Sequence, residues 1–343
     1  MDDRKRKVLL AIIQDYIATA EPIGSRTISR KYNLGVSPAT IRNEMSDLED
    51  MGFIEQPHTS AGRVPSDLGY RYYVDQLMEK QTLSQEEQNT ILHGYQNRVK
   101  EVAQVISQTG NLLSRLTNYT SLVMGPQVGD SSFKYIQMVL LEPSRALLLV
   151  VTDSGFVQNK ILDIPEAITQ DDLLKITQVL NEKLQGKNLA DIKLTLVKEL
   201  YMELANHKHL FKVIMDFIEG STGMEKGEKV FRGGTLNMLN QPEFRDINKV
   251  KTLLSLLEQD DLLKNLLTAT PEETGVMVKI GQENHEPGIA SCSMITATYQ
   301  ADGKVIGSIG VLGPTRMDYA KVVPIVEFMT KSLSDIFKDF YRK

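Results

Sequence analysis

The sequence predicts an α+β protein of several domains that begins with a winged helix-turn-helix. The first observation is the spacing of apolar residues over residues 8–48, which matches amphipathic helices. The second is a set of strand-like segments within residues 133–164 and 276–311. The third is length, because 343 residues correspond to roughly two to three domains of about 100 to 200 residues each.

Composition places the chain among ordinary globular proteins, with 41% hydrophobic and 24% charged residues. A single cysteine, Cys292, excludes an intramolecular disulfide framework and fits a reducing compartment. The N-terminal apolar run at residues 8–13 is too short for a secretion signal, and no run approaches the roughly eighteen residues of a membrane helix. We therefore expect a soluble, cytoplasmic protein with no membrane partner.

The N-terminal helices follow from apolar spacing and from the residues that end or begin a helix. A first helix is expected over residues 8–17, before Glu21-Pro22 ends it. A short second helix starts near Ser25. The segment Asn33-Leu-Gly-Val36 then supplies a turn, and Gly35 is the residue best able to adopt positive φ there.

The third helix should present a polar face suited to DNA. Ser37-Pro38 is a strong helix start, because the serine caps free N–H groups and proline tolerates the first helical position. Gly52 should end the helix. Arg42 beside Asn43 suits base edges, since arginine can bind guanine and asparagine adenine. The buried side is expected to hold Ile41, Met45 and Leu48, and the exposed side Ala39, Thr40, Arg42, Asn43 and Ser46.

A short wing follows, in which residues 53–56 and Arg63-Val64 pair as a hairpin with hydroxyl groups and no acid at its tip. The formal net charge of the whole chain is -5, yet residues 22–43 contain bases and no acid. A second basic point, residues 4–7, is expected to reach a neighbouring phosphate. Any one of these basic residues could instead be only a solvent-exposed residue on a helix face, with no contact to DNA. The predicted DNA-binding residues are Ser25, Arg26, Ser37, Thr40, Arg42, Asn43, Ser46, His58, Thr59, Ser60 and Arg63.

Three sequence blocks resemble one known family. The segment TSAGRVPSDLGYRYYVD at residues 59–75 resembles the wing and following helix of the bacterial heat-inducible transcription repressor family HrcA. The segment IGSIGVLGPTRMDYAKV at residues 306–322 resembles the C-terminal signature of that family, and GGTLN at residues 233–237 a shorter internal one. The blocks occur in the expected order, although the middle third of the chain matches less distinctly.

This resemblance implies a repressor in the heat-shock stress response that binds double-stranded DNA as a homodimer. The implied operator is an inverted repeat called CIRCE, upstream of chaperone genes, and the implied supporting partner is the chaperonin GroEL. The resemblance also implies a GAF-like domain into which a dimerising domain is inserted. We place the winged helix-turn-helix at residues 1–78, the split GAF-like domain at 84–130 and 222–343, and the inserted dimerising domain at 131–221.

The residues after the first domain predict both helices and strands. Ser84 and Glu87 form a capping box, and apolar residues from Ile91 to Ile106 follow a near-heptad spacing. These residues indicate either one helix that links the domains as a coiled coil or a helix packed on its own domain. Strands at residues 135–141, 146–152 and 156–162 should form an antiparallel meander, and further helices should contain Leu173 to Leu184, Leu194 to Leu200 and Phe211 to Ile218.

The C-terminal part reads as an α+β unit. After a linker at residues 220–227 we expect a strand at 229–231 and one leucine-rich helical stretch from Phe244 to Leu267. Three more strands and a final helix should follow, at residues 276–280, 289–299, 305–311 and near 322–329, with an Asp302-Gly303 hairpin turn.

Nothing in the sequence indicates an enzyme, a metal or a cofactor. The spacing of Gly307, Gly310 and Gly313 matches no phosphate-binding loop. His207 and His209 fall on different sides of a predicted helix. Cys292 is expected to be a packed residue and not a redox switch. Thr315 to Asp318 is either a ligand anchor or an Arg-Asp cap of the last helix.

Two functions remain open from the sequence. One is a chaperonin-governed repressor whose GAF-like domain is a scaffold with an apolar-filled interior. The other is a metabolite-sensing winged-helix regulator, which requires a polar effector pocket beneath the last three strands.

Overall fold

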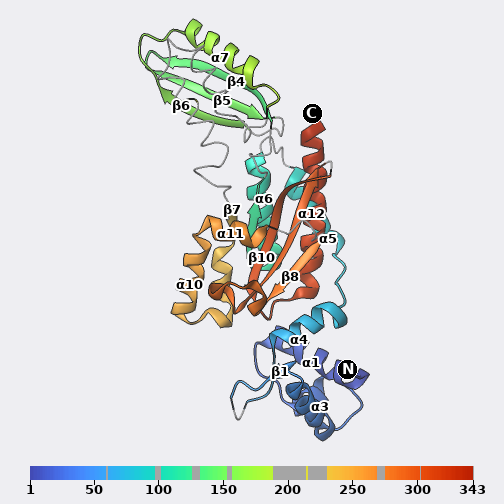
Figure 1. Cartoon of the computed structure of the whole chain (residues 1–343). Helices are drawn as coiled ribbons and strands as arrows, with labels where there is room; N and C mark the ends of the chain where they lie inside the picture. Colours follow the sequence, from blue (N-terminus) through green and yellow to red (C-terminus); the bar gives the residue numbers. More distant parts are fainter. Residues whose placement is uncertain are drawn as a thin grey trace.

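The structure is a computed structural model, whose described residues form helices and three separate sheets. Figure 1 shows the chain as three groups of elements, with the N-terminal group at one end and the smaller sheet at the other. We call them the N-terminal unit (residues 1–78), the five-stranded unit (84–125 and 230–342) and the three-stranded unit (132–187). The described residues are 1–58, 61–96, 102–125, 132–152, 157–187, 214, 230–268, 275–301 and 303–342.

The N-terminal unit has the predicted order of helices and wing. Gly35 and Gly52 both have positive φ, of +69° and +78°, so the predicted turn and the predicted helix stop are confirmed. The three N-terminal helices pack together through the buried side chains of Ile12, Ile28 and Ile41. Each fully buried side chain of this size contributes about 1.5–3 kcal/mol to the stability of the fold. The elements are α1 (Asp3–Thr19), α2 (Ser25–Lys31), α3 (Pro38–Asp50), β1 (Ile54–Glu55), β2 (Val64–Pro65), α4 (Asp67–Tyr72) and the π-helical turn η1 (Tyr73–Leu77).

The predicted linking helix is two helices that pack on each other, α5 (Gln85–Gln96) and α6 (Val102–Thr117). The hydroxyl groups of Tyr95 and Thr109 lie 3.0 Å apart, which a continuous helix would not allow at a separation of fourteen residues. The coiled-coil interpretation is therefore wrong, and packing within one unit is observed. The capping box is confirmed, with the Glu87 amide donating to Ser84 Oγ at 3.2 Å and the Ser84 amide to Glu87 Oε2 at 3.0 Å.

The five-stranded unit is built on an antiparallel sheet with the order β7-β3-β10-β9-β8. Helices cover both faces: α6 and α12 pack on one, and α10 and α11 on the other. On β3, Val123 belongs to the core beneath α12, whereas Leu122 and Met124 belong to the opposite core. The elements are β3 (Thr120–Met124), β7 (Val230–Gly233), α10 (Ile247–Leu257), α11 (Asp260–Leu267), β8 (Val276–Ile280), β9 (Cys292–Ala301), β10 (Lys304–Pro314) and α12 (Tyr319–Arg342).

The predicted helical stretch 244–267 is interrupted. Phe244 ends a short 3-10 turn, η6 (Pro242–Phe244), and Gln259 adopts an extended conformation between α10 and α11. Two acids, Asp260 and Asp261, follow in the first turn of α11, where the helix dipole favours negative charge. A second 3-10 turn, η5 (Thr235–Asn240), precedes η6.

The three-stranded unit is the predicted antiparallel meander, with α7 (Gln170–Leu184) packed on one face. Side chains of α7 also occupy the outer edge of the first strand: Asn181 binds both the amide and the carbonyl of Ile136, at 2.7 and 2.9 Å. This pairing protects that edge from a foreign strand. The strands are β4 (Phe133–Glu142), β5 (Arg145–Thr152) and β6 (Val157–Asp163).

Along the chain, the three-stranded unit lies between β3 and β7, which are neighbours in the five-stranded sheet. The helices expected at residues 194–200 and 211–218 and the linker at 220–227 fall outside the described residues, apart from Ile214. No helix in the described ranges is long and apolar enough to span a membrane.

Candidate nucleic-acid interface

The outer face of α3 carries unpaired polar groups. Ser37 caps the helix by accepting from the Thr40 amide at 3.1 Å, and Pro38 occupies the first turn, as predicted. Arg42, Asn43 and Ser46 are exposed. Within the described part of the chain, Arg42 and Asn43 form no hydrogen bond or ion pair, so both side chains are free to bind an external partner.

The inner face of α3 is held by charged groups that the sequence analysis missed. Glu44 is only 8% exposed, and Lys5 of α1 lies 2.9 Å from its carboxylate and 2.9 Å from that of Asp47. Hydrogen bonds to Glu44 and Asp47 raise the pKa of Lys5 well above its ordinary value. Arg4 also lies near Glu44, at 3.5 Å. In the free protein Lys5, and more loosely Arg4, thus bind α3, and the expectation that residues 4–7 form a second basic point for phosphate stays a prediction.

One predicted basic residue of α2 is also used internally. Lys31 pairs with Asp15, which is 5% exposed, and Tyr32 donates its hydroxyl to the same carboxylate at 3.4 Å. The hydrogen bond to Asp15 raises the pKa of Lys31. Lys31 thus fixes α2 to α1, whereas Arg26 and Arg30 stay exposed.

The wing is tied to the end of α3 and to the segment before α2. Arg63 binds Glu49 through Nε at 2.9 Å and Nη2 at 2.7 Å. The backbone of Arg63 pairs with Ile23, N to O at 3.0 and 2.8 Å, which extends the two-stranded wing by a bridge that the sequence did not indicate. An arginine expected at the surface for phosphate therefore orients the wing in the free protein.

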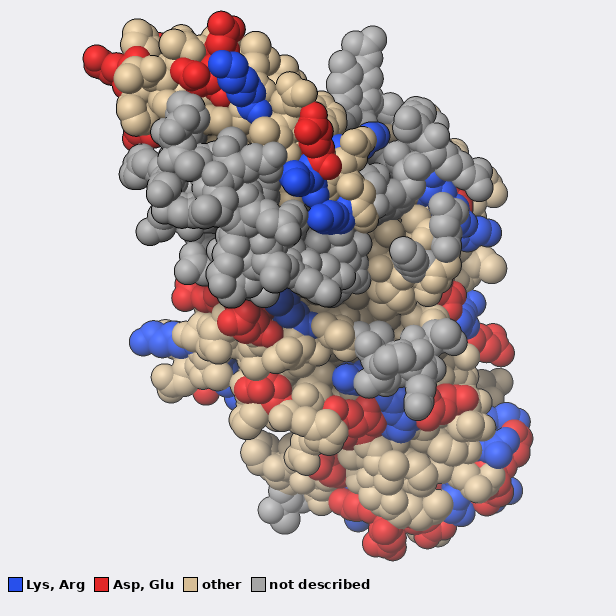
Figure 2. All heavy atoms as spheres, turned by 45° about the horizontal axis from the view of Figure 1, so that its top comes forward, with Lys and Arg blue, Asp and Glu red and all other residues tan. Residues whose placement is uncertain are grey.

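The remaining predicted residues have mixed positions. His58 is exposed at the wing tip, and Ser25 is partly buried at the start of α2. Thr59 and Ser60 lie outside the described residues. On the face shown in Figure 2, basic and acidic side chains are interspersed over the lower part of the molecule and form no large field of one sign. This face therefore has no field of one sign that would by itself mark a nucleic-acid contact.

Comparisons with known proteins decide the family. The profile described as "HrcA protein C terminal domain" matches residues 103–323. The heat-inducible transcription repressor HrcA of Pelotomaculum thermopropionicum is 57% identical over 342 residues, covering 100% of this chain and 98% of that protein. The chain belongs to the HrcA family. The HrcA of Desulforamulus reducens agrees, with 55% identity over 97% of this chain and 96% of that protein.

A solved structure supports the fold of this HrcA-family chain over its whole length. The crystal structure of a hypothetical protein at 2.2 Å resolution superposes with a TM-score of 0.72 at 24% identity, covering 99% of both chains. The HrcA relatives are named as transcription repressors, so the family is one of regulators and not of enzymes.

The residues weighed as signs of catalysis have structural roles. A Cβ atom on Gly307 would collide with the carbonyl oxygen of Met124, and one on Gly313 would lie 2.8 Å from the Tyr119 ring, so these glycines of β10 permit close packing. Cys292 is 1% exposed, and burial raises the pKa of its thiol to about 12. His207 and His209 lie outside the described residues, and the described part of the chain has no cluster of metal-ligating side chains.

The polar segment before the last helix forms a helix cap, but without the predicted arginine. Asp318 caps α12, accepting from the Lys321 amide at 3.3 Å. Arg316 pairs with Glu243 and not with Asp318. The prediction of an Arg-Asp cap is therefore confirmed for Asp318 and wrong for Arg316. The hydrogen-bond partners of Arg316 are other groups of the protein.

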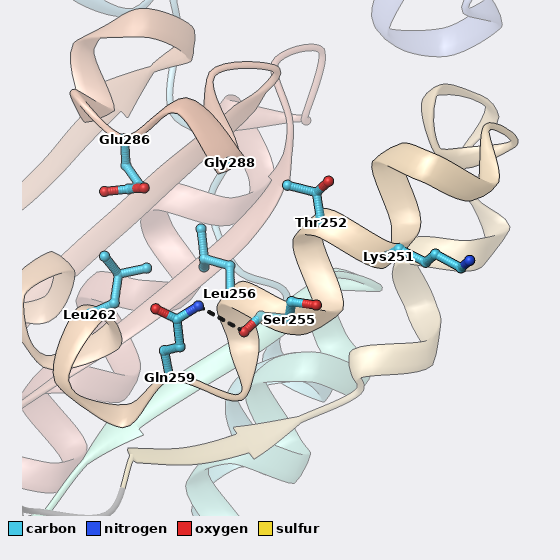
Figure 3. Close-up of a pocket in the computed structure, with 8 residues that line it drawn as sticks. All are labelled: Lys251, Thr252, Ser255, Leu256, Gln259, Leu262, Glu286 and Gly288. Atoms are coloured by element: carbon cyan, nitrogen blue, oxygen red, sulfur yellow. Dashed lines mark hydrogen bonds between the residues drawn. The ribbon is translucent and has the colours of Figure 1, made fainter.

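The interior beneath the last three strands is filled by apolar side chains. Ile295 and Ile309 from the sheet meet Val326, Met329 and Phe337 from α12, and all are fully buried. A cavity of about 440 Å³ lies elsewhere, between α10 and the turn at residues 286–288. Figure 3 shows that the side chain of Lys251 points away from the other lining side chains. Its lining residues are Lys251, Thr252, Ser255, Leu256, Gln259, Leu262, Glu286 and Gly288.

Proposed function

We propose that this HrcA-family chain represses heat-shock chaperone genes by binding, as a dimer, an inverted-repeat operator of the CIRCE type. The observation that carries the proposal is the exposed and unpaired pair Arg42 and Asn43 on a rigidly supported α3. Because its target is bacterial chromosomal DNA, the protein acts in the cytoplasm.

The positions of these two side chains on α3 suit them to recognise a DNA sequence. Arg42 and Asn43 lie in the N-terminal half of α3, the part of a recognition helix that meets base edges in the major groove. Arg42 suits guanine O6 and N7, and Asn43 suits adenine N6 and N7. The two α3 helices of a dimer then occupy two half-sites, so that operator symmetry mirrors protein symmetry.

The other predicted residues act on the phosphate backbone. Ser37 and Thr40 present hydroxyls at the start of α3, 3.0 Å apart, where N–H groups and the helix dipole favour phosphate. Arg63 can contribute to DNA binding only if its guanidinium leaves Glu49 and binds a phosphate instead. This group is Ser25, Arg26, Ser37, Thr40, Ser46, His58, Thr59, Ser60 and Arg63.

The three-stranded unit is proposed as the dimerising domain, inserted into the GAF-like domain that the five-stranded unit forms. One face of its sheet packs on α7, while apolar residues remain exposed on the other: Tyr135 at 41%, Val139 at 40%, Leu141 at 50% and Ile161 at 48%. An apolar sheet face of this kind is typical of a homodimer interface.

A role for the GroEL chaperonin is part of this proposal, and one feature of the structure supports it. Leu236 and Ile247 are 72% and 70% exposed, and chaperonins bind exposed apolar surface of this kind. When misfolded protein occupies the chaperonin, the repressor loses this support and the chaperone genes are released. The metabolite-sensing alternative has less support, because the interior beneath β8, β9 and β10 is apolar and filled.

The test is fluorescence anisotropy of a labelled CIRCE-type duplex against a scrambled duplex of equal composition, at one salt concentration. We expect a clear preference for the operator and a gain in affinity when chaperonin is added. Equal binding of both duplexes by a folded dimer would contradict sequence-specific repression. Operator preference without any effect of chaperonin would contradict only the chaperonin part.

A further inference from the structure

Two arginines cross the contact between the N-terminal unit and the five-stranded unit, one from each side. Arg71 on α4 donates Nε to Glu283 Oε1 at 2.9 Å, and its Nη2 reaches Glu283 Oε2 and the carbonyl oxygen of Val278. Val278 lies on β8, an edge strand, where carbonyl groups are left for such a partner. Beside this fork, Asp67 accepts from the Gln282 amide at 3.1 Å.

Arg316 makes the reciprocal contact from the five-stranded unit. Its Nη1 donates to the carbonyl oxygen of Ile17 at 3.0 Å, in the last turn of α1, where carbonyls lack a partner within the helix. Its other nitrogens bind Glu243 and, at 3.1 Å, Gln241 Oε1. Arg316 is 9% exposed and thus caps α1 from another unit.

The segment that joins the two units is also fixed. Pro324 lies inside α12 and has no N–H to offer the carbonyl of Ala320 four residues earlier. That carbonyl instead accepts from the Gln81 amide at 3.0 Å. Next to it, Lys80 pairs with Glu327 of α12. The segment that joins the two units is therefore bound to α12 at Lys80 and Gln81.

Apolar packing continues across the same contact. Tyr70 and Tyr319 are 1% and 0% exposed, and their ring centroids lie 5.9 Å apart. They belong to one core cluster that includes residues of both units. Domains joined by small polar contacts normally move relative to each other, whereas a shared core and directional arginine forks resist rotation.

We infer that Arg71 and Arg316 are positioning residues for operator recognition, which fix the angle between α3 and the five-stranded unit. Figure 1 shows α3 at the end of the N-terminal unit away from this contact, so the arginines orient the DNA-reading face without covering it. The inference rests on the proposed dimeric repressor. Both arginines fall within the two long segments that resemble the family, a signal that the sequence analysis did not use.

The orientation matters because a dimer must match both half-sites at once. Each inserted base pair moves one half-site by about 3.4 Å along the duplex and turns it by about 35°. Rigid units should therefore bind one half-site spacing and reject its neighbours. Loosened units should tolerate several spacings.

The experiment measures the affinity of full-length protein for operator duplexes whose half-sites are moved apart or together by one and two base pairs. A duplex with one half-site and a scrambled duplex of equal composition are measured beside them. The variants are Arg71→Gln and Arg316→Gln. The control is Arg232→Gln, because the Arg232–Asp260 pair has side-chain exposures of 28% and 39%, against 27% and 38% for Arg71–Glu283, yet lies wholly within the five-stranded unit.

We expect wild-type protein and Arg232→Gln to prefer the natural spacing by at least about tenfold, equivalent to about 1.4 kcal/mol. Arg71→Gln and Arg316→Gln should reduce this ratio at least about threefold while half-site affinity stays within about twofold. An unchanged spacing ratio would overturn the inference, and so would a parallel loss on every duplex, since that indicates lost folding alone. Failure of the wild type to prefer a half-site over scrambled DNA would overturn the proposed function itself.

A charge exchange guards against misfolding of the single variants. Arg71→Glu with Glu283→Arg keeps an ion pair across the contact, so the double variant should recover part of the spacing ratio that Arg71→Glu loses. No recovery in a double variant that has wild-type thermal stability would also overturn the inference.

Discussion

Gly69 of α4 packs directly on the carbonyl oxygen of Phe53, so that a Cβ atom at residue 69 would lie far inside contact distance of that oxygen. We expect Gly69→Ala to lower the free energy of unfolding by about 1–3 kcal/mol, because α4 must move away from the wing. The measurement is urea unfolding followed by circular dichroism. Gly125→Ala is the control, since its nearest neighbour atom, on Ile106, lies at an ordinary 3.6 Å. Equal stability of the two variants would refute this packing argument.

The contact between the N-terminal unit and the five-stranded unit should become weaker as the pH falls. Burial raises the pKa of Glu283, but hydrogen bonds from Arg71 and the Ile280 amide outweigh this effect, so the net pKa is lower than the ordinary 4.5. A carboxyl with a lowered folded-state pKa stabilises the fold above its unfolded pKa, and this contribution disappears as the pH falls through the folded value.

Wild-type protein should therefore exceed Glu283→Gln in stability by about 1 kcal/mol at pH 7, a modest value because Glu283 is partly exposed. Calorimetric melting should show this difference shrinking below about pH 4.5. Glu258→Gln, at an exposed position on the same unit, is the control and should keep wild-type stability at pH 7. A difference that persists at pH 3 would exclude the Arg71 pair as its cause.

The open face of the three-stranded sheet should control dimerisation. Val139→Lys places a charge on that face and should weaken the dimer at least about tenfold, because charge is depleted from interface cores. Leu174→Lys is the matched control, since Leu174 is also exposed, at 54%, but lies on α7. Sedimentation velocity over a range of protein concentrations separates the two. Loss of the dimer in both variants, or in neither, would move the interface elsewhere.

Cys292 should be chemically inert in the folded protein. With the thiol pKa raised to about 12 by burial, alkylation by iodoacetamide at pH 8 should be at least about a hundredfold slower than in urea-unfolded protein. Mass spectrometry of timed samples measures both rates. Comparable rates would show that the thiol is accessible and would reopen a redox role.

Local signals predicted local structure well. Ser37, Pro38, Gly35 and Gly52 act on backbone groups within a few residues of themselves, so their roles as cap, first-turn residue, turn and stop were visible in the sequence. Hydrophobic spacing, by contrast, does not show where a chain reverses. The apolar residues from Ile91 to Ile106 match one helix, although α5 and α6 pack on each other.

Long-range partners could not be predicted for the candidate site. Lys5 and Arg63 read as free bases in the sequence because Glu44 and Glu49, which bind them, lie 39 and 14 residues away. Arg316 likewise binds Ile17 across 299 residues. What the sequence did identify is the exposed pair Arg42 and Asn43, because helical spacing alone separates them from Ile41 and Leu48.

The central claim is that Arg42 reads the operator sequence, and the most direct measurement is the affinity of Arg42→Ala for operator and scrambled duplexes at one salt concentration. We expect a loss of about 1–3 kcal/mol on the operator and almost none on scrambled DNA. Arg245→Ala, at an exposed arginine of the five-stranded unit, should bind both duplexes as the wild type does. An equal loss on both duplexes would make Arg42 a phosphate contact, and no loss on either would remove α3 from the reading surface.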